Sequence, residues 1–232
     1  MKDLFGNALL DYQNGNYTQD ITTSTNISDE DVLPLPYLFR AFKDMPTLEQ
    51  KALKLCKGSV LDVGCGSGIH SLYLQKKGFK VKAIDVSNGA IEVAKKRGVL
   101  HAEVLPLLGE HHTFDTILLL MNGTGIFQEL TQVSKYLAHL KSLLNTNGQI
   151  LIDSSDIKYM YEDEDGGYWM DMNSSYYGEL DYFLSYKNEE EAPMKWLYLD
   201  FETLKLACET LDLKCELVLE GEHFDYLAKI TA

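Results

Sequence analysis

The sequence predicts an α/β protein with a doubly wound, mostly parallel sheet and a terminal antiparallel hairpin. Between residues 58 and 156, short apolar runs alternate with amphipathic stretches, which is the pattern of strand–helix–strand crossovers in a parallel sheet. Near the C-terminus, the apolar runs 214–222 and 224–231 have almost nothing between them. Because so short a link cannot make a parallel crossover, these two strands are expected to form a hairpin.

The alternating region begins with a buried strand at 57–66 that ends in glycines, followed by a helix at 69–78 with lysines in its last turn. The next strand, 80–86, leads to Ser87, a good N-cap, and to a helix that ends at Gly98. The other predicted elements are a weak strand at 101–108 interrupted by Pro106, a strong strand at 114–121, an amphipathic helix at 130–144, a strand at 148–156 and a helix at 201–213.

We expect one domain, because no internal repeat or low-complexity linker divides the chain. It is expected to have four parts. These are an N-terminal cap and helix (1–57), a core (58–156), an insertion (157–198), and a terminal helix with its hairpin (199–232). The cap is polar and turn-rich at first and ends in an amphipathic helix at 47–56.

The composition is that of a globular protein, with 232 residues of which 45% are hydrophobic and 24% charged. No apolar run reaches the roughly 18 residues of a membrane span, and the N-terminal stretch is too short and too acidic for a signal peptide. Cys56, Cys65, Cys208 and Cys215 show no CxxC spacing. We therefore expect reduced cysteines and a cytoplasmic location. We also expect a monomer or homodimer that binds no membrane.

A glycine turn, "LDVGCGSGIH" at 61–70, follows the first strand of the core. Such a turn lets the backbone approach a ligand closely beside a helix N-terminus. The dinucleotide fingerprint G-x-G-x-x-G fails here because its third glycine falls on Ile69, and no Gly-Lys-Ser/Thr follows for a P-loop. A nicotinamide-dependent dehydrogenase is thus a disfavoured alternative.

The motif "VLDVGCGSG" resembles the first motif of the class I S-adenosylmethionine-dependent methyltransferases. The order of elements resembles their seven-stranded, Rossmann-like fold, over roughly residues 35–156 and 198–232. The resemblance implies an enzyme that takes a methyl group from S-adenosylmethionine by in-line displacement and leaves S-adenosylhomocysteine. A binding protein that keeps the cofactor fold without turnover is the alternative.

The resemblance also implies cofactor-binding residues. Gly64, Cys65, Gly66 and Gly68 would form the turn against the cofactor, and Asp62 would hold the amino end of its methionine moiety. A lone carboxylate in a buried strand is costly unless it is paired. The alternative for Asp62 is that it caps the N–H groups of the turn itself.

Further ligand positions follow from the same resemblance. Asp85, nineteen residues after Gly66, would accept hydrogen bonds from a ribose diol, since Ser87 is better placed to cap the next helix. Val86 is expected to bind the cofactor next to Asp85. Many family members meet the adenine with an acid after the third strand, where this sequence has Leu105 and Pro106. Here the base would be held by apolar contact and a backbone N–H.

Two more pairs complete the expected cofactor site. Met121 and Asn122 would lie beside the sulfonium, or else would simply end a strand and form a turn. Upstream, Tyr37 and Arg40 would close over the methionine carboxylate. The alternative for Arg40 is a surface salt bridge.

The catalytic candidates are Asp153 and Asp156, at the carboxyl end of a strand, and His70, in the first helical turn after the glycines. A neutral amine or hydroxyl acceptor would need its proton removed. The alternatives are that Asp153 caps a turn and that His70 is structural. No metal is expected, because aligning 161–172 to a calcium loop puts Tyr161 and Met172 at ligand positions, and His111–His112 has no third ligand.

The charge pattern bears on the acceptor. The net charge of −14 argues against nucleic acid, and residues 151–200 contribute −10 of it, with 13 acids against 3 lysines. Eleven aromatic residues lie between 159 and 198, where 176–187 and 194–200 alternate like a β-hairpin. We expect this insertion to be a lid that favours a neutral or cationic small acceptor, or else a packing or dimer-forming hairpin.

Overall fold

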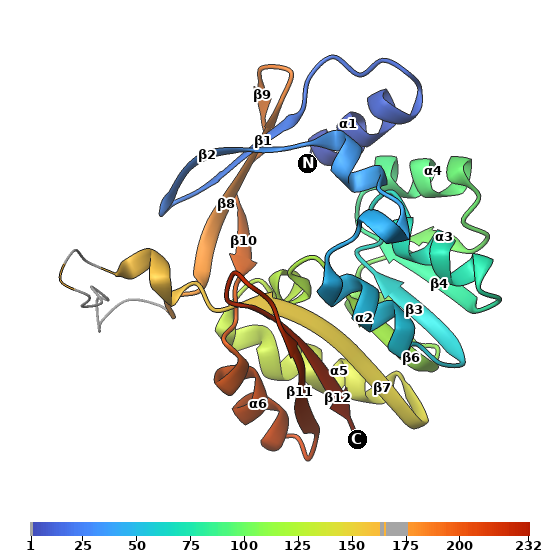
Figure 1. Cartoon of the computed structure of the whole chain (residues 1–232), viewed down its shortest axis with the longest axis vertical. Coiled ribbons are helices and arrows are strands. Elements are labelled where there is room, and N and C mark those ends of the chain that lie inside the picture. Colours follow the sequence, from blue (N-terminus) through green and yellow to red (C-terminus); the bar gives the residue numbers. More distant parts are fainter. Residues whose placement is uncertain (1, 163–164, 166–175) are drawn as a thin grey trace.

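The computed structural model describes residues 2–162, 165 and 176–232. Its larger sheet has seven strands in the order β11-β12-β7-β6-β3-β4-β5 (Figure 1). The strands are β3 (Ser59–Val63), β4 (Lys80–Asp85), β5 (Ala102–Val104), β6 (Phe114–Leu119), β7 (Leu144–Ser155), β11 (Lys214–Glu220) and β12 (Asp225–Thr231). The five strands from β7 to β5 are parallel, whereas β12 is antiparallel to both β7 and β11. The predicted fold, including its terminal hairpin, is confirmed.

Helices cover both faces of this sheet. On one face α2 (Thr47–Leu55) and α3 (Ile69–Lys76) pack over Val60 and Leu118, and on the other α5 (Val133–Ser142) and α6 (Phe201–Glu209) pack over Leu61 and Ile117. Neighbouring strand residues thus point to opposite faces, and both are buried. This is why the strands appear as continuous apolar runs in the sequence.

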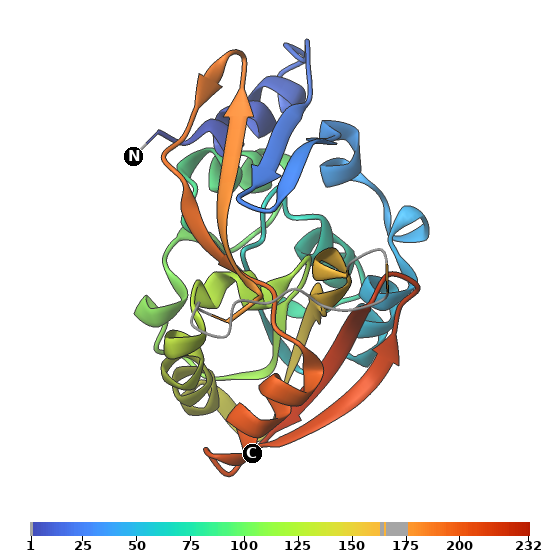
Figure 2. The same cartoon turned by 90° about the vertical axis from the view of Figure 1, so that its left-hand side faces the viewer.

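A second sheet joins the N-terminal cap to the insertion. Its strands are β1 (Ile21–Thr25), β2 (Ser28–Leu33), β8 (Glu179–Tyr186), β9 (Glu189–Glu190) and β10 (Met194–Leu197). The path β10-β8-β1-β2 is antiparallel throughout. The hairpin of the insertion was predicted, but β1 and β2 were not. Figures 1 and 2 show this small sheet standing beside the end of the large sheet from which the glycine turn emerges.

Helix α1 (Leu4–Gln13), which the sequence did not predict, is fixed across α4 (Asn88–Arg97). The Asp3 carboxylate caps both helices: Oδ1 accepts from Gly6 N at 3.0 Å, and Oδ2 accepts from Ser87 Oγ at 3.0 Å and Gly89 N at 2.9 Å. A Cβ on Gly89 would lie 2.5 Å from the carbonyl carbon of Gly6. Two glycines therefore allow the helices to cross closely.

The strand predicted at 101–108 is shorter in the structure, and part of the acidic segment lies outside the described residues. The stretch 101–108 holds only the three-residue strand β5, because Pro106 has no N–H to donate. The residues Asp163, Gly166, Tyr168, Trp169 and Met172 of the acidic segment lie outside the described residues. Within the described ranges, no helix is long and apolar enough to cross a bilayer.

Candidate active site

The glycine turn adopts the conformation that its composition predicts. Gly64, Gly66 and Gly68 have φ values of +70°, +52° and +82°, a region that other residues rarely adopt. Their surroundings differ. A Cβ on Gly68 would lie 2.7 Å from Val99 Cγ2, so this glycine serves packing, whereas the nearest atom to a Cβ on Gly66 is Phe5 Cζ at 3.9 Å. Gly66 thus leaves open space where the ligand is expected.

Cys65, between these glycines, points into the core. Its side chain packs with Ile91 and Ala94 of α4, and burial raises the pKa of its thiol. The residue is therefore placed to contact a ligand through its backbone only.

Asp85 supports the turn directly. Its Oδ2 accepts from Gly66 N at 2.9 Å and its Oδ1 from Ser87 N at 2.9 Å. Burial raises the pKa of Asp85, although these backbone N–H groups oppose the shift. Ser87 is the N-cap of α4, accepting from Ala90 N, as predicted. The carboxylate of Asp85 is therefore a fixed acceptor at the carboxyl end of β4.

The predicted adenine contacts lie at the same edge. Val86 follows Asp85 and is 71% exposed, unusual for a valine in a folded core. Leu105 is partly buried, and its N–H donates to the Asp85 carbonyl at 2.9 Å. The structure thus brings Asp85, Val86 and Leu105 together, from β4 and the turn after β5.

Asp62 does not cap the turn that follows it. Gly64 N and Cys65 N both donate to the Ile84 carbonyl, at 2.9 and 3.1 Å. The Asp62 side chain is 2% exposed, and its Oδ2 accepts from Ser71 Oγ of α3 at 2.6 Å. One hydroxyl partner leaves acceptor capacity on this carboxylate, which is consistent with the expected ligand role.

Three buried side chains meet beside the turn. Arg40 follows the 3₁₀ helix η1 (Leu35–Phe39), Glu49 lies in α2, and His70 lies in α3. Arg40 Nη2 donates to Glu49 Oε1, and Glu49 Oε2 lies 2.8 Å from His70 Nε2. All three residues are at most 8% exposed. The surface salt bridge considered for Arg40 is therefore wrong, because its ion pair is buried.

Glu49 was not predicted as a site residue. Burial alone would raise the pKa of this carboxyl, but the hydrogen bond with His70 and the charge of Arg40 lower it below its usual range. The available signal was a carboxylate on the buried face of an amphipathic helix, between Leu48 and Ala52.

A second turn follows β6. Met121 and Asn122 both have positive φ, +68° and +60°. Asp153 holds this turn, since Oδ2 accepts from Met121 N at 2.9 Å and Oδ1 from Gly123 N at 2.8 Å. Burial raises the pKa of Asp153 to about 7 despite these two bonds. The capping alternative is observed, and a catalytic role for Asp153 stays a prediction.

The Asn122 side chain points into the protein. Its Oδ1 accepts from Ser154 Oγ at 3.0 Å, and its Nδ2 donates to the Leu197 carbonyl at 3.3 Å. Met121 instead packs against the cluster that holds Tyr182 and Leu184 of β8. The turn after β6 is thereby joined to the second sheet on both sides.

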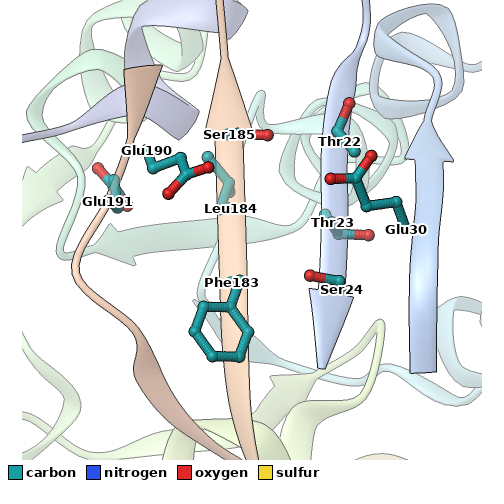
Figure 3. Close-up of a pocket in the computed structure, with 9 residues that line it drawn as sticks. All are labelled: Thr22, Thr23, Ser24, Glu30, Phe183, Leu184, Ser185, Glu190 and Glu191. Carbon is teal, nitrogen blue, oxygen red and sulfur yellow. The ribbon is translucent and has the colours of Figure 1, made fainter. Parts of the chain in front are cut away.

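The two faces of the second sheet differ. Tyr182 and Leu184 lie on the inner face, and the Tyr182 and Trp196 ring centroids are 5.7 Å apart. Phe183 and Ser185 alternate with these residues and point to the outer face, where residues 22–24 of β1 and 183–185 of β8 line a shallow pocket of about 100 Å³ (Figure 3). That pocket contains Thr22, Ser24, Phe183, Ser185 and Glu190, and none of the predicted site residues.

Potential metal ligands are not clustered in the part of the chain that the structure describes. Among the residues that the structure describes, no group of three or more His, Cys, Asp or Glu side chains could hold a metal ion. The His112 side chain is 79% exposed, and its Nδ1 lies 2.7 Å from Oε1 of the buried Glu110.

The chain resembles known methyltransferases throughout its length. The methyltransferase-domain family matches residues 60–148. A methyltransferase from Bacteroides fragilis, crystallised with S-adenosyl-L-homocysteine, is 43% identical with a TM-score of 0.93, and the match covers 100% of this chain and 95% of that one. This chain belongs to the class I S-adenosylmethionine-dependent methyltransferases. It is therefore an enzyme with S-adenosylmethionine as its cofactor, and the nicotinamide-dependent alternative is wrong.

Curated relatives of this methyltransferase match only in part. A ubiquinone biosynthesis O-methyltransferase of Pasteurella multocida is 30% identical over 46% of this chain and 50% of its own. A ribosomal protein L11 methyltransferase of Ruminiclostridium cellulolyticum is 34% identical over 39% of this chain and 32% of its own. The chain thus spans half or less of the length of these relatives, and their acceptors differ.

The residues present fit the cofactor. Arg40 Nε is buried and has no hydrogen-bond partner in the part of the chain that the structure describes, so a donor is available for a carboxylate. Gly66 leaves open space at the turn, and Val86 leaves an exposed apolar surface beside Asp85.

Proposed function

We propose that this methyltransferase methylates a small, neutral or cationic acceptor, held where the second sheet meets the turn after β6. The observation that carries the proposal is the aromatic inner face of that sheet, where Tyr182 packs in the same cluster as Met121 and its ring lies beside that of Trp196. Aromatic faces bind apolar groups and attract cations. Burial raises the pKa of Tyr198 to about 12, so this nearby hydroxyl remains neutral.

The overall charge supports a small molecule over nucleic acid. A matched relative from Pyrococcus horikoshii is a 23S rRNA methyltransferase, but the likeness covers 25% of this chain. This chain has a net charge of −14, and binding to phosphates requires clustered Lys and Arg. Its four cysteines are free, which supports the predicted cytoplasmic location. We keep a monomer or homodimer as the expected state.

We assign the cofactor contacts as follows. Asp62 holds the amino group of the methionine end, Arg40 and Tyr37 lie at its carboxylate, and Asp85 accepts from the ribose. Val86 and Leu105 contact the adenine, with Gly64, Gly66 and Gly68 as the wall of the site. This assignment is supported by the free donor on Arg40 and by the single hydroxyl partner of Asp62.

In the reaction, the bound cofactor supplies a methyl group already activated by its sulfonium. The work of the protein is to align the acceptor, which can contribute about 7–11 kcal/mol to lowering the barrier, and to accept a proton where the acceptor carries one. Asp153 and His70 are the proposed proton acceptors. Their support is the pKa of about 7 of Asp153 and the position of His70 Nδ1, which has no hydrogen bond to the described residues.

A donor assay across pools of small amines, alcohols and phosphorylated metabolites, read by a mass increase of one methyl group, tests this proposal. We expect transfer to a neutral or cationic compound. Deleting residues 160–175 is expected to preserve S-adenosylhomocysteine binding and abolish transfer. Exclusive methylation of RNA or of phosphorylated compounds would contradict the proposed acceptor class, and full activity of the folded deletion variant would contradict the lid.

A further inference from the structure

Glu49, in α2, connects the residue after η1 with the first turn of α3. One carboxylate oxygen accepts from Arg40, next to η1, and the other lies 2.8 Å from Nε2 of His70, just after the glycine turn. The side chain is 4% exposed. These three buried side chains depend on one another, because removing one of them leaves a buried polar group without its hydrogen-bond partner.

The guanidinium of Arg40 is fixed in orientation. Besides the bond to Glu49, Nη1 donates to the Tyr37 carbonyl at 2.6 Å, and the Tyr37 ring centroid lies 3.7 Å from Cζ. Two hydrogen bonds and a stacked ring define the plane of this group. Arg is suited to such a role because its planar fork matches the geometry of a carboxylate.

One N–H donor of the Arg40 guanidinium has no acceptor among the described residues. Arg40 Nε is buried and makes no hydrogen bond to any described residue. A buried N–H without a partner reduces stability, so folding alone does not account for it. A carboxylate arriving with a ligand would satisfy it.

We propose that Glu49 is a positioning residue that holds Arg40 so that its free donor meets the methionine carboxylate of the cofactor. His70 fixes Glu49 from the other side and so acts through it. This inference rests on the proposed role of Arg40 as the carboxylate ligand. It adds the requirement that recognition of the carboxylate depends on a residue that does not touch the cofactor.

The test uses two ligands that differ only in this carboxylate, S-adenosylmethionine and decarboxylated S-adenosylmethionine, with binding measured by calorimetry. We expect the unmodified protein to prefer the carboxylated ligand by about 10-fold or more, the usual size for hydrogen bonds to a charged group. Glu49→Ala is expected to reduce that preference to within about 3-fold and to leave binding of the decarboxylated ligand nearly unchanged. Equal weakening of both ligands, or an unchanged or larger preference, would overturn the inference.

Further variants separate this inference from the proposed function. Arg40→Gln should also remove the preference. If Arg40→Gln keeps it, the carboxylate site at Arg40 is wrong; if Arg40→Gln removes it while Glu49→Ala keeps it, only the role of Glu49 is wrong. His70→Gln, which retains a donor near Nε2, should preserve more of the preference than His70→Ala. Should Glu49→Ala fail to fold, Glu49→Gln, which keeps the size of the side chain, is judged by the same ratio.

Discussion

Two turns flank the proposed site, and they are built in opposite ways. The turn after β3 has positive φ at three glycines, Gly64, Gly66 and Gly68, which adopt it at no steric cost. The turn after β6 has positive φ at Met121 and Asn122, where side chains make that conformation unfavourable. In the second turn, the conformation is held by Asp153 and by the hydrogen-bonded amide of Asn122.

This difference separates what local sequence determines from what tertiary contacts impose. In the first turn, the positive φ values come from the glycines themselves, and the backbone N–H groups of residues 64–66 donate to the next strand in the chain, to Ile84 and Asp85. The second depends on β7 and β10, through Asp153 and Leu197. We therefore expect mutations in the first turn to affect ligand binding, and mutations in the second to affect folding stability first.

The largest effect is expected for Gly66→Val. Among the described residues, no atom lies nearer to a Cβ on Gly66 than Phe5 Cζ at 3.9 Å, so a side chain there fits the protein but occupies the ligand's place. We expect the affinity for S-adenosylhomocysteine to fall by about 100-fold or more, equivalent to roughly 2.7 kcal/mol, in calorimetry on a folded variant.

Gly78→Val is the matched control for Gly66→Val. Gly78 also has positive φ, +90°, and no atom of the described residues lies within 4 Å of a Cβ built there, so it carries the same kind of backbone strain after α3, away from the turn. Its affinity should be unchanged. Normal binding by Gly66→Val would show that the turn does not contact the cofactor.

The second turn is tested by Asp153→Asn. Asparagine has one acceptor oxygen, so one of the N–H groups of Met121 and Gly123 would face an amide N–H. We expect a loss of about 2–3 kcal/mol in the free energy of unfolding at pH 5, the size for a buried donor left unsatisfied. Urea denaturation measures it.

The pH dependence of the same variant gives an independent test. Burial raises the pKa of Asp153 to about 7, above the value of about 4 in an unfolded chain. The folded state therefore binds the proton on Asp153 more tightly than the unfolded chain does. The resulting stabilisation of the folded state is fully present below about pH 4 and is lost as the pH rises through about 7. The stability difference between the unmodified protein and Asp153→Asn should shrink from pH 5 to pH 8. A constant difference would contradict the raised pKa.

Asp85→Ala should weaken S-adenosylhomocysteine binding by about 1–3 kcal/mol, as for lost hydrogen bonds to a charged group. Because Asp85 also accepts from Gly66 and Ser87, Asp85→Asn, which keeps one acceptor, should lose less. Calorimetry measures both variants, and thermal unfolding shows whether the turn survives. An unchanged dissociation constant for Asp85→Ala would exclude the ribose assignment.

The same contrast explains how far the sequence could predict this molecule. The large sheet was predictable because its central strands β3, β6 and β7 are buried on both faces and contain apolar runs, while Ser87 and Gly98 mark the two ends of the helix after β4. Asp62 and Asp85 were located because their positions relative to the glycine turn match those that the family resemblance implies.

The missed elements depend on distant partners. The strands "ITTST" and "SDEDVL" have few apolar residues and form a sheet because Thr22 to Thr25 pair with residues 182–185. Glu49 resembles any acid in the first turn of a helix, and its role arises only when folding brings it to Arg40 and His70. The neighbours of Glu49 along the chain indicate that it is buried, but they do not indicate its partners.

The smallest expected changes in unfolding free energy come from replacing asparagine by glycine in two turns, at Asn188 and at Asn122. Asn188 lies with Lys187 in the two-residue loop between β8 and β9, where both have positive φ, +62° and +51°. Its exposed side chain has no hydrogen bond to the described residues. Asn188→Gly should therefore stabilise the protein by about 0.5 kcal/mol, since glycine suits this hairpin turn. Asn122→Gly relieves the same kind of strain but removes two hydrogen bonds, from Ser154 Oγ and to the Leu197 carbonyl, so we expect a loss of about 1–2 kcal/mol. Urea denaturation that gives both variants the same sign would show that contacts from β7 and β10 do not hold the second turn.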